Sequence, residues 1–164
     1  MIGRVGTRLL LVLAIGATIG CDRVTKHVAA TNLAGLPRQS FLADTVRLEY
    51  VENTGAFLGL GADWPAAVRT ACFGVGNGLL LLLMIGLAVR RRWPTLALAG
   101  VALFVAGGSS NLLDRVARGS VIDFLNVGLG PVRTGIFNVA DIAIMLGAVL
   151  VVFASYRAGD DTLT

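Results

Sequence analysis

The 164-residue sequence is poor in charge, in histidine and in cysteine. Only 15% of its residues are charged and 55% are hydrophobic, which excludes an ordinary water-soluble domain and indicates a membrane protein. The single histidine, His27, has no partner at metal-ligand spacing, and Cys21 and Cys72 do not form a Cys-x-x-Cys pair. No Ser-His arrangement or phosphate-binding loop is present. We therefore expect no metal site, and we expect both thiols to be free and buried.

Four hydrophobic segments approach the length of a transmembrane helix, which needs roughly 20 apolar residues. Thr70–Val89 and Trp93–Leu113 hold no charged residue, whereas the first and last segments carry polar residues toward one end. The sequence predicts an all-α polytopic membrane protein with one membrane domain. Its four transmembrane helices are expected at about 9–30, 67–89, 94–113 and 135–156, and its outer connections at about 31–66 and 114–134.

Basic residues predict the orientation of these spans. They precede the first span, fill the connection between the second and third, and follow the fourth: Arg4, Arg8, Arg90, Arg91, Arg92 and Arg157. By the positive-inside rule both termini are cytoplasmic, which predicts a multi-pass protein with its longer connections outside. The net charge of +4 then reflects topology, and no nucleic-acid partner is expected.

The first outer connection is expected to form a small strand-rich flap on the outer surface. Thr45–Val51 alternates apolar and polar residues, as a half-buried strand does. The segment Asn53–Phe57 follows as a turn, and Asp63-Trp64-Pro65 supplies an interfacial aromatic residue and a helix-starting proline. Arg133, in the second connection, is expected to be solvated.

The first span also has features of a lipoprotein export signal. Arg4 and Arg8 precede the apolar run Leu9–Ala17, and Cys21 would follow the cleavage point. However, Thr18 is a poor residue at the third position before that cysteine, and three further spans follow. An uncleaved first span is therefore favoured.

Two aspartates are candidates for catalysis, because an ionisable side chain at membrane depth is costly and needs a partner or a function. Asp141 is expected about six residues into the fourth span, with Asn138 three residues earlier on the same helix face. Asp123 lies between apolar residues in the second outer connection. Each taken alone is also consistent with a packing or loop role. Together, two carboxylates that share a proton can activate water and protonate a substrate carbonyl without a metal.

Two further groups of polar residues lie near the outer ends of spans. Asp22 and Lys26 are four residues apart on one helix face, which favours a structural ion pair. Asn111, Asp114 and Arg115 can all point into one interior face. An Asp114–Arg115 ion pair at the membrane surface and a contact with substrate explain this second group equally well.

Several motifs, in order among four spans, resemble those of the lipoprotein signal peptidase (signal peptidase II) family, and the likeness covers about Asp22–Tyr156. The motifs are Asp22-Arg23-Val24-Thr25-Lys26, Asn53-Thr54-Gly55-Ala56-Phe57, Asn111-Leu112-Leu113-Asp114-Arg115, Val121-Ile122-Asp123-Phe124 and Phe137-Asn138-Val139-Ala140-Asp141. The turn lacks one of the family's two alanines, and Ala106–Ser110 replaces its usual Gly-Gly-x-x-Gly. These departures bear on substrate fit, because both aspartate segments are intact.

The resemblance implies an aspartic endopeptidase that removes the signal peptide from prolipoproteins, cutting before a cysteine that carries a diacylglyceryl group. Asp123 and Asp141 would be its catalytic pair, and it would need no cofactor. The residues that bind substrate or support the site would be Asn53, Gly55, Asn111, Asp114, Arg115, Asn138, Asp22 and Lys26. The expected partners are diacylglyceryl-prolipoproteins and membrane lipids. We expect a monomer in the bacterial inner membrane, with a strand-rich periplasmic flap and an active site near the periplasmic face.

Two other functions are compatible with polar residues in membrane spans. A proton-coupled channel or carrier also places carboxylates in spans, but it predicts polar residues through the cytoplasmic half. Leu79–Ala88, Leu96–Val105 and Ile142–Phe153 hold no charge, and no inverted repeat is evident. A non-catalytic scaffold or immunity protein derived from the peptidase would share the same spans, although the presence of both aspartates argues against it.

Overall fold

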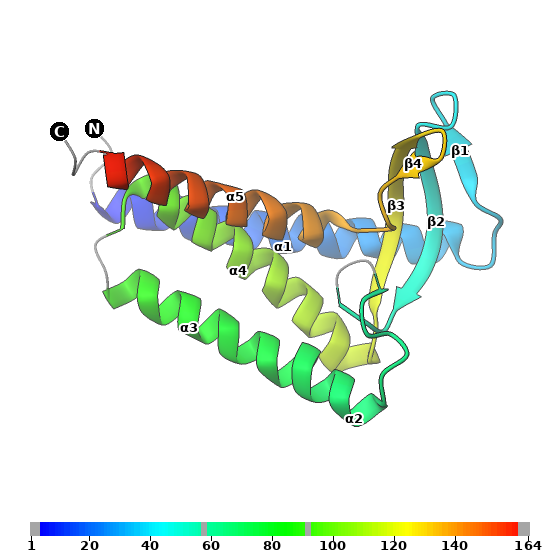
Figure 1. The fold of residues 1–164 in the computed structure, drawn as a ribbon, viewed down its shortest axis with the longest axis horizontal. Coiled ribbons are helices and arrows are strands. Elements are labelled where there is room, and N and C mark those ends of the chain that lie inside the picture. Colours follow the sequence, from blue (N-terminus) through cyan, green and yellow to red (C-terminus); the bar gives the residue numbers. More distant parts are fainter. Residues whose placement is uncertain (1–3, 57–58, 91–92, 161–164) are drawn as a thin grey trace.

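The structure, a computed structural model, describes residues 4–56, 59–90 and 93–160 (Figure 1). In chain order the elements are α1 (Arg4–Leu33), β1 (Gln39–Phe41), β2 (Val46–Asn53), α2 (Ala66–Arg69), the π-helix η2 (Thr70–Gly76), α3 (Asn77–Arg90), α4 (Thr95–Arg118), β3 (Val121–Leu129), β4 (Val132–Arg133) and α5 (Val139–Asp160). Phe57, assigned above to the turn, and Arg91 and Arg92, assigned to the cytoplasmic connection, lie outside the described residues.

Long helices dominate the fold and run side by side, with a small sheet across one end (Figure 1). Three of them are long and apolar enough to cross a membrane: Ala66–Arg90, Thr95–Arg118 and Val139–Arg157. The remaining helix, α1, has 30 residues and is less apolar because it contains Asp22, Arg23 and Lys26. The chain is thus a mostly helical, multi-pass membrane protein with a small antiparallel sheet.

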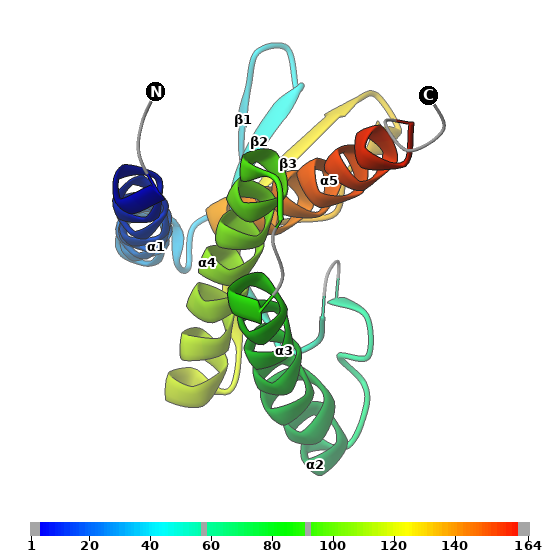
Figure 2. The ribbon, with the colours of Figure 1, turned by 90° about the vertical axis from the view of Figure 1, so that its left-hand side faces the viewer.

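Helix α4 is central, because α1, α3 and α5 all pack against it (Figure 2). The contact between α4 and α5 is close because both helices carry glycines there. A β-carbon at Gly100 would lie 2.7 Å from the carbonyl oxygen of Gly147, and one at Gly107 would overlap the carbonyl of Ala140. Small residues of this kind let membrane helices approach at backbone distance. The approach brings the N-terminal end of α5 against the C-terminal half of α4.

The four strands form one antiparallel sheet in the order β1-β2-β3-β4. Strand β2 matches the strand expected at Thr45–Val51, whereas β3 and β4 were not predicted. One face of β3 rests on the C-terminal end of α1, where Ile122 packs with Ala29 and Leu33. Because neighbouring residues of a strand point to opposite faces, Asp123 points away from that core.

Arg133 ties the turns of the sheet together instead of being solvated as predicted. Its side chain is 11% exposed, and its guanidinium donates to the side chain of Asn126 (2.6 Å) and to the carbonyl of Asp44 (2.7 Å). The first contact links β4 to β3, and the second links β4 to the β1–β2 turn. Arg133 is covered because the two turns pair side by side, which the sequence alone did not indicate.

The prediction that both cysteines are buried is wrong. Cys21 and Cys72 are both exposed. Cys21 shares an outward face of α1 with Val24 and Val28, which are also exposed. The buried face of this part of α1 is instead occupied by Asp22 and Lys26.

Candidate active site

Asp141 lies in the first turn of α5, and not about six residues into a span as the sequence suggested. The helix begins at Val139, because Asn138 and Asp141 cap it reciprocally. The side-chain oxygen of Asn138 accepts from the Asp141 amide (2.9 Å), and the Asp141 carboxylate accepts from the Asn138 amide (3.1 Å). This is the geometry of a capping box. It fixes the Asp141 side chain, and the helix N-terminus favours a negative charge there.

Asp123 is held by two side-chain amides. Asn138 donates to one carboxylate oxygen (2.6 Å) and Asn53 donates to the other (2.9 Å). The sheet register explains the second contact. Val51 pairs with Asp123 and Asn53 pairs with Val121, so Asn53 is the diagonal neighbour of Asp123 on the same face. A bulge in β2 between Leu48 and Val51 lies directly beside this pairing.

Asn138 therefore connects the two aspartates, one from β3 and one from α5. Its side chain donates to Asp123, while its backbone amide donates to Asp141. Burial raises the pKa of Asp123 to about 6, and the negative charge of Asp141 adds to the rise, against the lowering effect of Asn53 and Asn138. The pair thus holds a proton at a pH where an isolated aspartate has lost it.

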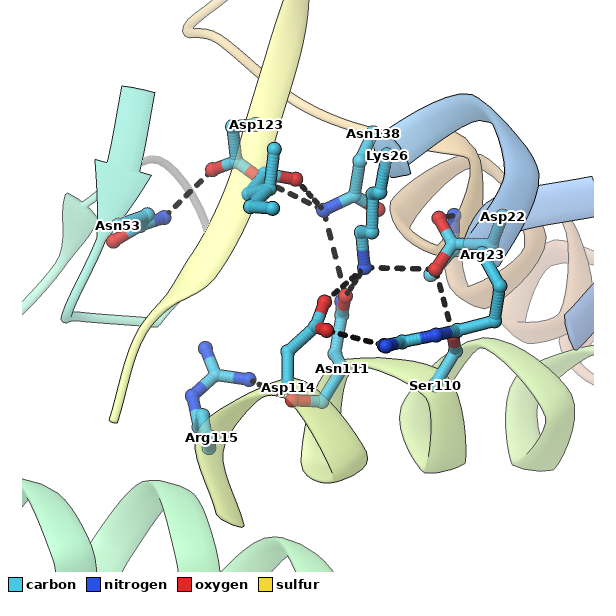
Figure 3. A network of polar contacts seen from close by, with 12 residues as sticks. Asp22, Arg23, Lys26, Asn53, Ser110, Asn111, Asp114, Arg115, Asp123 and Asn138 are labelled. Carbon is cyan, nitrogen blue, oxygen red and sulfur yellow. Dashed lines mark hydrogen bonds and ion pairs between the residues drawn. The ribbon is translucent and has the colours of Figure 1, made fainter. Parts of the chain in front are cut away.

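Asn111 is the second residue that holds Asp141. Its side-chain nitrogen donates to the Asp141 carboxylate (2.8 Å), while its side-chain oxygen accepts from the ammonium of Lys26 (2.8 Å). An ammonium group can only donate, so Lys26 determines which end of the amide faces Asp141. Figure 3 shows Lys26 reaching from α1 to this amide. Lys26 is 2% exposed, so its hydrogen bond to Asn111 is buried.

Two buried aspartates balance the charge of Lys26. Its ammonium lies 2.7 Å from Asp22 and 2.8 Å from Asp114 (Figure 3). Asp114 also pairs with Arg23 of α1, so the alternative of an Asp114–Arg115 ion pair is wrong. Consecutive residues on a helix point about 100° apart, which separates those two side chains.

Asp22 does more than pair with Lys26. It accepts hydrogen bonds from the hydroxyl of Ser110 (2.6 Å) and from the backbone amide of Ala140 (2.8 Å). The second contact caps the first turn of α5, immediately before Asp141. Asp22 thereby joins α1, α4 and α5 at the level of the candidate site.

Arg115 contacts the turn that follows β2. Its guanidinium donates to the carbonyl of Gly55 (2.7 Å) and, more weakly, to the carbonyl of Asn111 (3.3 Å). Gly55 is buried, and a β-carbon there would lie 2.6 Å from the carbonyl oxygen of Leu60. The same turn is held by Asn53, whose side-chain oxygen accepts from the Gly55 amide (2.9 Å). The glycine lets this turn pack against the backbone of Gly59 and Leu60, and its carbonyl accepts the hydrogen bond from Arg115.

A cavity of about 510 Å³ opens beside Asp141. Its lining comes from the post-β2 turn, η2, α3, α4 and α5: Ala56, Cys72, Phe73, Gly76, Asn77, Leu80, Asn111, Arg115, Asp141, Ile144, Met145 and Ala148. Asn111 contacts both Asp141 and Arg115 in this lining, most of which is apolar. This combination suits an apolar ligand with one polar segment.

Phe73 borders the cavity but was not predicted as a site residue. The Phe73 ring stacks on Trp64 at 5.7 Å and lies 6.0 Å from the Arg115 guanidinium. An aromatic residue near the outer end of a span was a usable signal, whereas the π-helix that presents it has no simple sequence signature. Among the described residues, no group of three His, Cys, Asp or Glu side chains could hold a metal ion.

The fold and the site together define a class: a multi-pass membrane protein in which one asparagine links two carboxylates at one end of a helical bundle. The family described as Signal peptidase (SPase) II matches residues 14–157. A lipoprotein signal peptidase of Psychromonas ingrahamii is 35% identical over 161 residues, covering 96% of this chain and 90% of that protein. A lipoprotein signal peptidase of Rhodococcus jostii is 34% identical over 151 residues, covering 88% of this chain and 71% of that protein.

The fold agrees with these sequence relationships. A solved structure described as a bacterial membrane enzyme superposes with a TM-score of 0.82 at 21% identity, covering 93% of this chain and 90% of that one. The chain belongs to the signal peptidase II family. The resemblance noted from its motifs is thereby confirmed.

Proposed function

We propose that this chain is an intramembrane aspartic endopeptidase that removes the signal peptide from diacylglyceryl-modified prolipoproteins, cutting before the lipidated cysteine. Asp123 and Asp141 form its catalytic pair. Membership of the signal peptidase II family supports the substrate class. One structural observation carries the assignment of the pair: both carboxylates accept hydrogen bonds from Asn138, and Asp141 borders the cavity.

The two aspartates have different surroundings, which supports different roles. Asp141 lies at a helix N-terminus, where negative charge is favoured, and acts as the base toward water. Asp123, with its raised pKa, carries the shared proton.

The reaction then follows in two steps. In the first, Asp141 takes a proton from water as the water oxygen attacks the scissile carbonyl carbon, and Asp123 gives its proton to the carbonyl oxygen. In the second, the carbon–nitrogen bond breaks. Asp141 returns its proton to the leaving amine of the cysteine, while Asp123 takes a proton from the tetrahedral diol. The signal peptide leaves as a carboxylic acid, and both aspartates regain their starting states.

The supporting residues take part through the contacts described above. Asn138 and Asn111 fix the two carboxylates, and Lys26 with Asp22 and Asp114 fixes Asn111. Arg115 and the Asn53–Gly55 turn lie where they can position the substrate backbone next to the pair. The proposed enzyme is a monomer.

The membrane placement is also part of the proposal. Four helices span the bacterial inner membrane: α1, the continuous α2–η2–α3 helix, α4 and α5. Arg8, Arg90 and Arg157 lie at one end of the bundle, while the sheet and the aspartates lie at the other. The positive-inside rule then makes both termini cytoplasmic and places the active site near the periplasmic face. α1 spans despite its charges because Asp22 and Lys26 are buried and paired.

The cavity accounts for the form of the substrate. Leu80, Ile144, Met145 and Ala148 offer an apolar surface to a signal helix in the bilayer. Asp141 and its neighbours lie where that helix ends. A scissile bond just beyond a lipid-embedded segment would therefore meet the pair.

The test compares a diacylglyceryl-modified prolipoprotein with its unmodified form as substrates of the purified protein. We expect cleavage of the modified form alone. Asp123→Asn and Asp141→Asn should each reduce that cleavage by about a thousandfold or more and remain folded in detergent, because an amide cannot exchange the required proton. Turnover near the wild-type rate by either variant would refute the assignment of the pair.

A further inference from the structure

A second, smaller cavity lies away from the candidate active site and forms a groove of about 160 Å³. Only aliphatic side chains line it, and they come from α1, α3 and α4: Leu11, Ile15, Ile85, Ala88, Val89, Leu98, Val101, Ala102 and Val105. On α4 its nearest lining residue, Val105, precedes Asn111 by six residues, or about 9 Å of helix. The groove is thus separate from the polar network.

The groove exists because two helices share α4 without closing on each other. α1 and α3 both pack against α4 and make at most marginal contact with one another. Figure 2 shows α4 lying between them. Val101, Ala102 and Val105 of α4 form the floor, and α1 and α3 form the walls.

Hydrocarbon is the occupant that fits this lining. The groove offers a water molecule no polar side chain, and ordered water requires two or more polar partners. If the groove were empty, the side chains of its walls would lose the dispersion contacts that an occupant supplies. Ile85 and Val89, on the α3 wall, are 43% and 80% exposed, so the groove is open to the bilayer. An acyl chain can enter it from the side.

Two arginines mark the end of the groove where a lipid headgroup would lie. Arg8 precedes Leu11 by three residues and Ile15 by seven, so it lies on the groove-lining face of α1. Arg90 follows Val89 at the C-terminal end of α3. Both side chains are exposed, and neither makes an ion pair or a side-chain hydrogen bond within the described ranges. Guanidinium groups beside an aliphatic groove match a phosphate attached to an acyl chain.

We infer that the groove between α1, α3 and α4 binds an acyl chain of an anionic phospholipid, whose phosphate is held by Arg8 and Arg90. The lipid fills the space between two helices that barely touch and so stabilises α1 against the rest of the bundle. This inference requires only that the chain is a membrane protein. It stands or falls independently of the peptidase assignment.

The test adds lipids of matched chains to the purified full-length protein in detergent. Dioleoyl phosphatidylglycerol should raise the melting temperature more than dioleoyl phosphatidylcholine, and native mass spectrometry should show it retained preferentially. In Arg8→Gln/Arg90→Gln this preference should be lost, with binding of the anionic lipid weakened roughly fivefold for each arginine. Ala88→Phe, which fills the groove, should reduce stabilisation by both lipids.

Arg157→Gln is the matched control. Arg157 is another exposed arginine at the same end of the bundle, but it lies on α5 beside Phe153 and away from the groove. It should keep the lipid preference. Equal stabilisation by both lipids, an equal loss in Arg157→Gln, or the same effect from glycerol phosphate without acyl chains would overturn the inference.

Discussion

Two clusters of opposite charges in this molecule differ chiefly in burial. In the bundle, Asp22, Lys26 and Asp114 are each at most 2% exposed. On the sheet, Asp44 is 45% exposed and accepts from Arg47 at 2.7 Å. A buried charge that loses its partner is strongly destabilising, whereas an exposed pair is screened by water and salt. Ion pairs between the same kinds of side chain therefore support the candidate active site in the bundle and a turn in the sheet.

The largest effect should follow from Lys26→Met, which leaves Asp22 and Asp114 buried without their shared cation. We expect a loss of about 3–5 kcal/mol in the free energy of unfolding, together with loss of cleavage. Asp22→Asn/Lys26→Met removes one charge of each sign and should recover part of the stability. It should not recover cleavage, because the Asn111 amide is no longer oriented. Thermal unfolding in detergent and a cleavage assay measure both, and a stable, active Lys26→Met would contradict the role of the network.

Arg115→Ala should separate catalysis from stability. Cleavage should fall roughly 10- to 100-fold, because the guanidinium no longer holds the Gly55 turn beside the pair. Stability should fall much less than in Lys26→Met, since Asp114 keeps Lys26 and Arg23 as partners. Destabilisation as large as that of Lys26→Met would show that Arg115 belongs to the buried cluster after all.

Asp123→Asn should change how stability depends on pH. The pKa of Asp123 is raised from 3.8 to about 6 in the folded protein. Protonated Asp123 therefore contributes fully to stability below pH 3.8, and this contribution is lost as the pH rises through about 6. Asparagine does not ionise, so the variant does not lose stability in this way. Between pH 4 and pH 7, the free energy of unfolding of the variant should therefore rise by up to about 3 kcal/mol relative to that of the wild type. A stability difference that does not vary with pH would argue against the raised pKa.

Asp44→Asn should have the smallest effect. Hydrogen bonds from Arg47 and Ser40 hold the pKa of Asp44 below its usual range, so its contribution is present at neutral pH and is lost only as the pH falls below about 3.8. Cleavage at neutral pH should stay close to the wild-type rate. Any loss of stability should be small and should shrink further at high salt, because the cluster is exposed. A loss of stability as large as that of Lys26→Met would show that the exposed cluster is as important for stability as the buried one.

Much of the site was predictable because its parts are short motifs with clear chemistry. Asp141, Asn138 and the Asp22–Lys26 pair stood out as polar residues in apolar segments, and the alternation in Thr45–Val51 indicated β2. Strand β3 was missed because its sequence contains Asp123, Asn126 and Gly128, and pairing with β2 decides its conformation.

The partners of the buried charges were harder to predict. Their local spacing suggested an ion pair between Asp114 and Arg115. In the structure, Asp114 instead forms ion pairs with Arg23 and Lys26, which belong to a different helix. Such pairing depends on how α1 packs on α4, and no pattern within one helix encodes that. The start of α5 was misplaced for a related reason, since apolar residues from Gly135 onward resemble a helix until the Asn138 cap is considered.

The most direct test of the catalytic pair is the pH dependence of kcat/KM for a diacylglyceryl-modified prolipoprotein, measured in a buffer that contains a chelator. Two carboxylates that share one proton are active only between their two macroscopic pKa values, so the profile should be bell-shaped. Because the pKa of Asp123 is about 6, the alkaline limb should fall near pH 6, well above the usual aspartate value, and the chelator should have no effect. Loss of activity that zinc restores, or a profile without an acid limb while the protein stays folded, would contradict the aspartic mechanism.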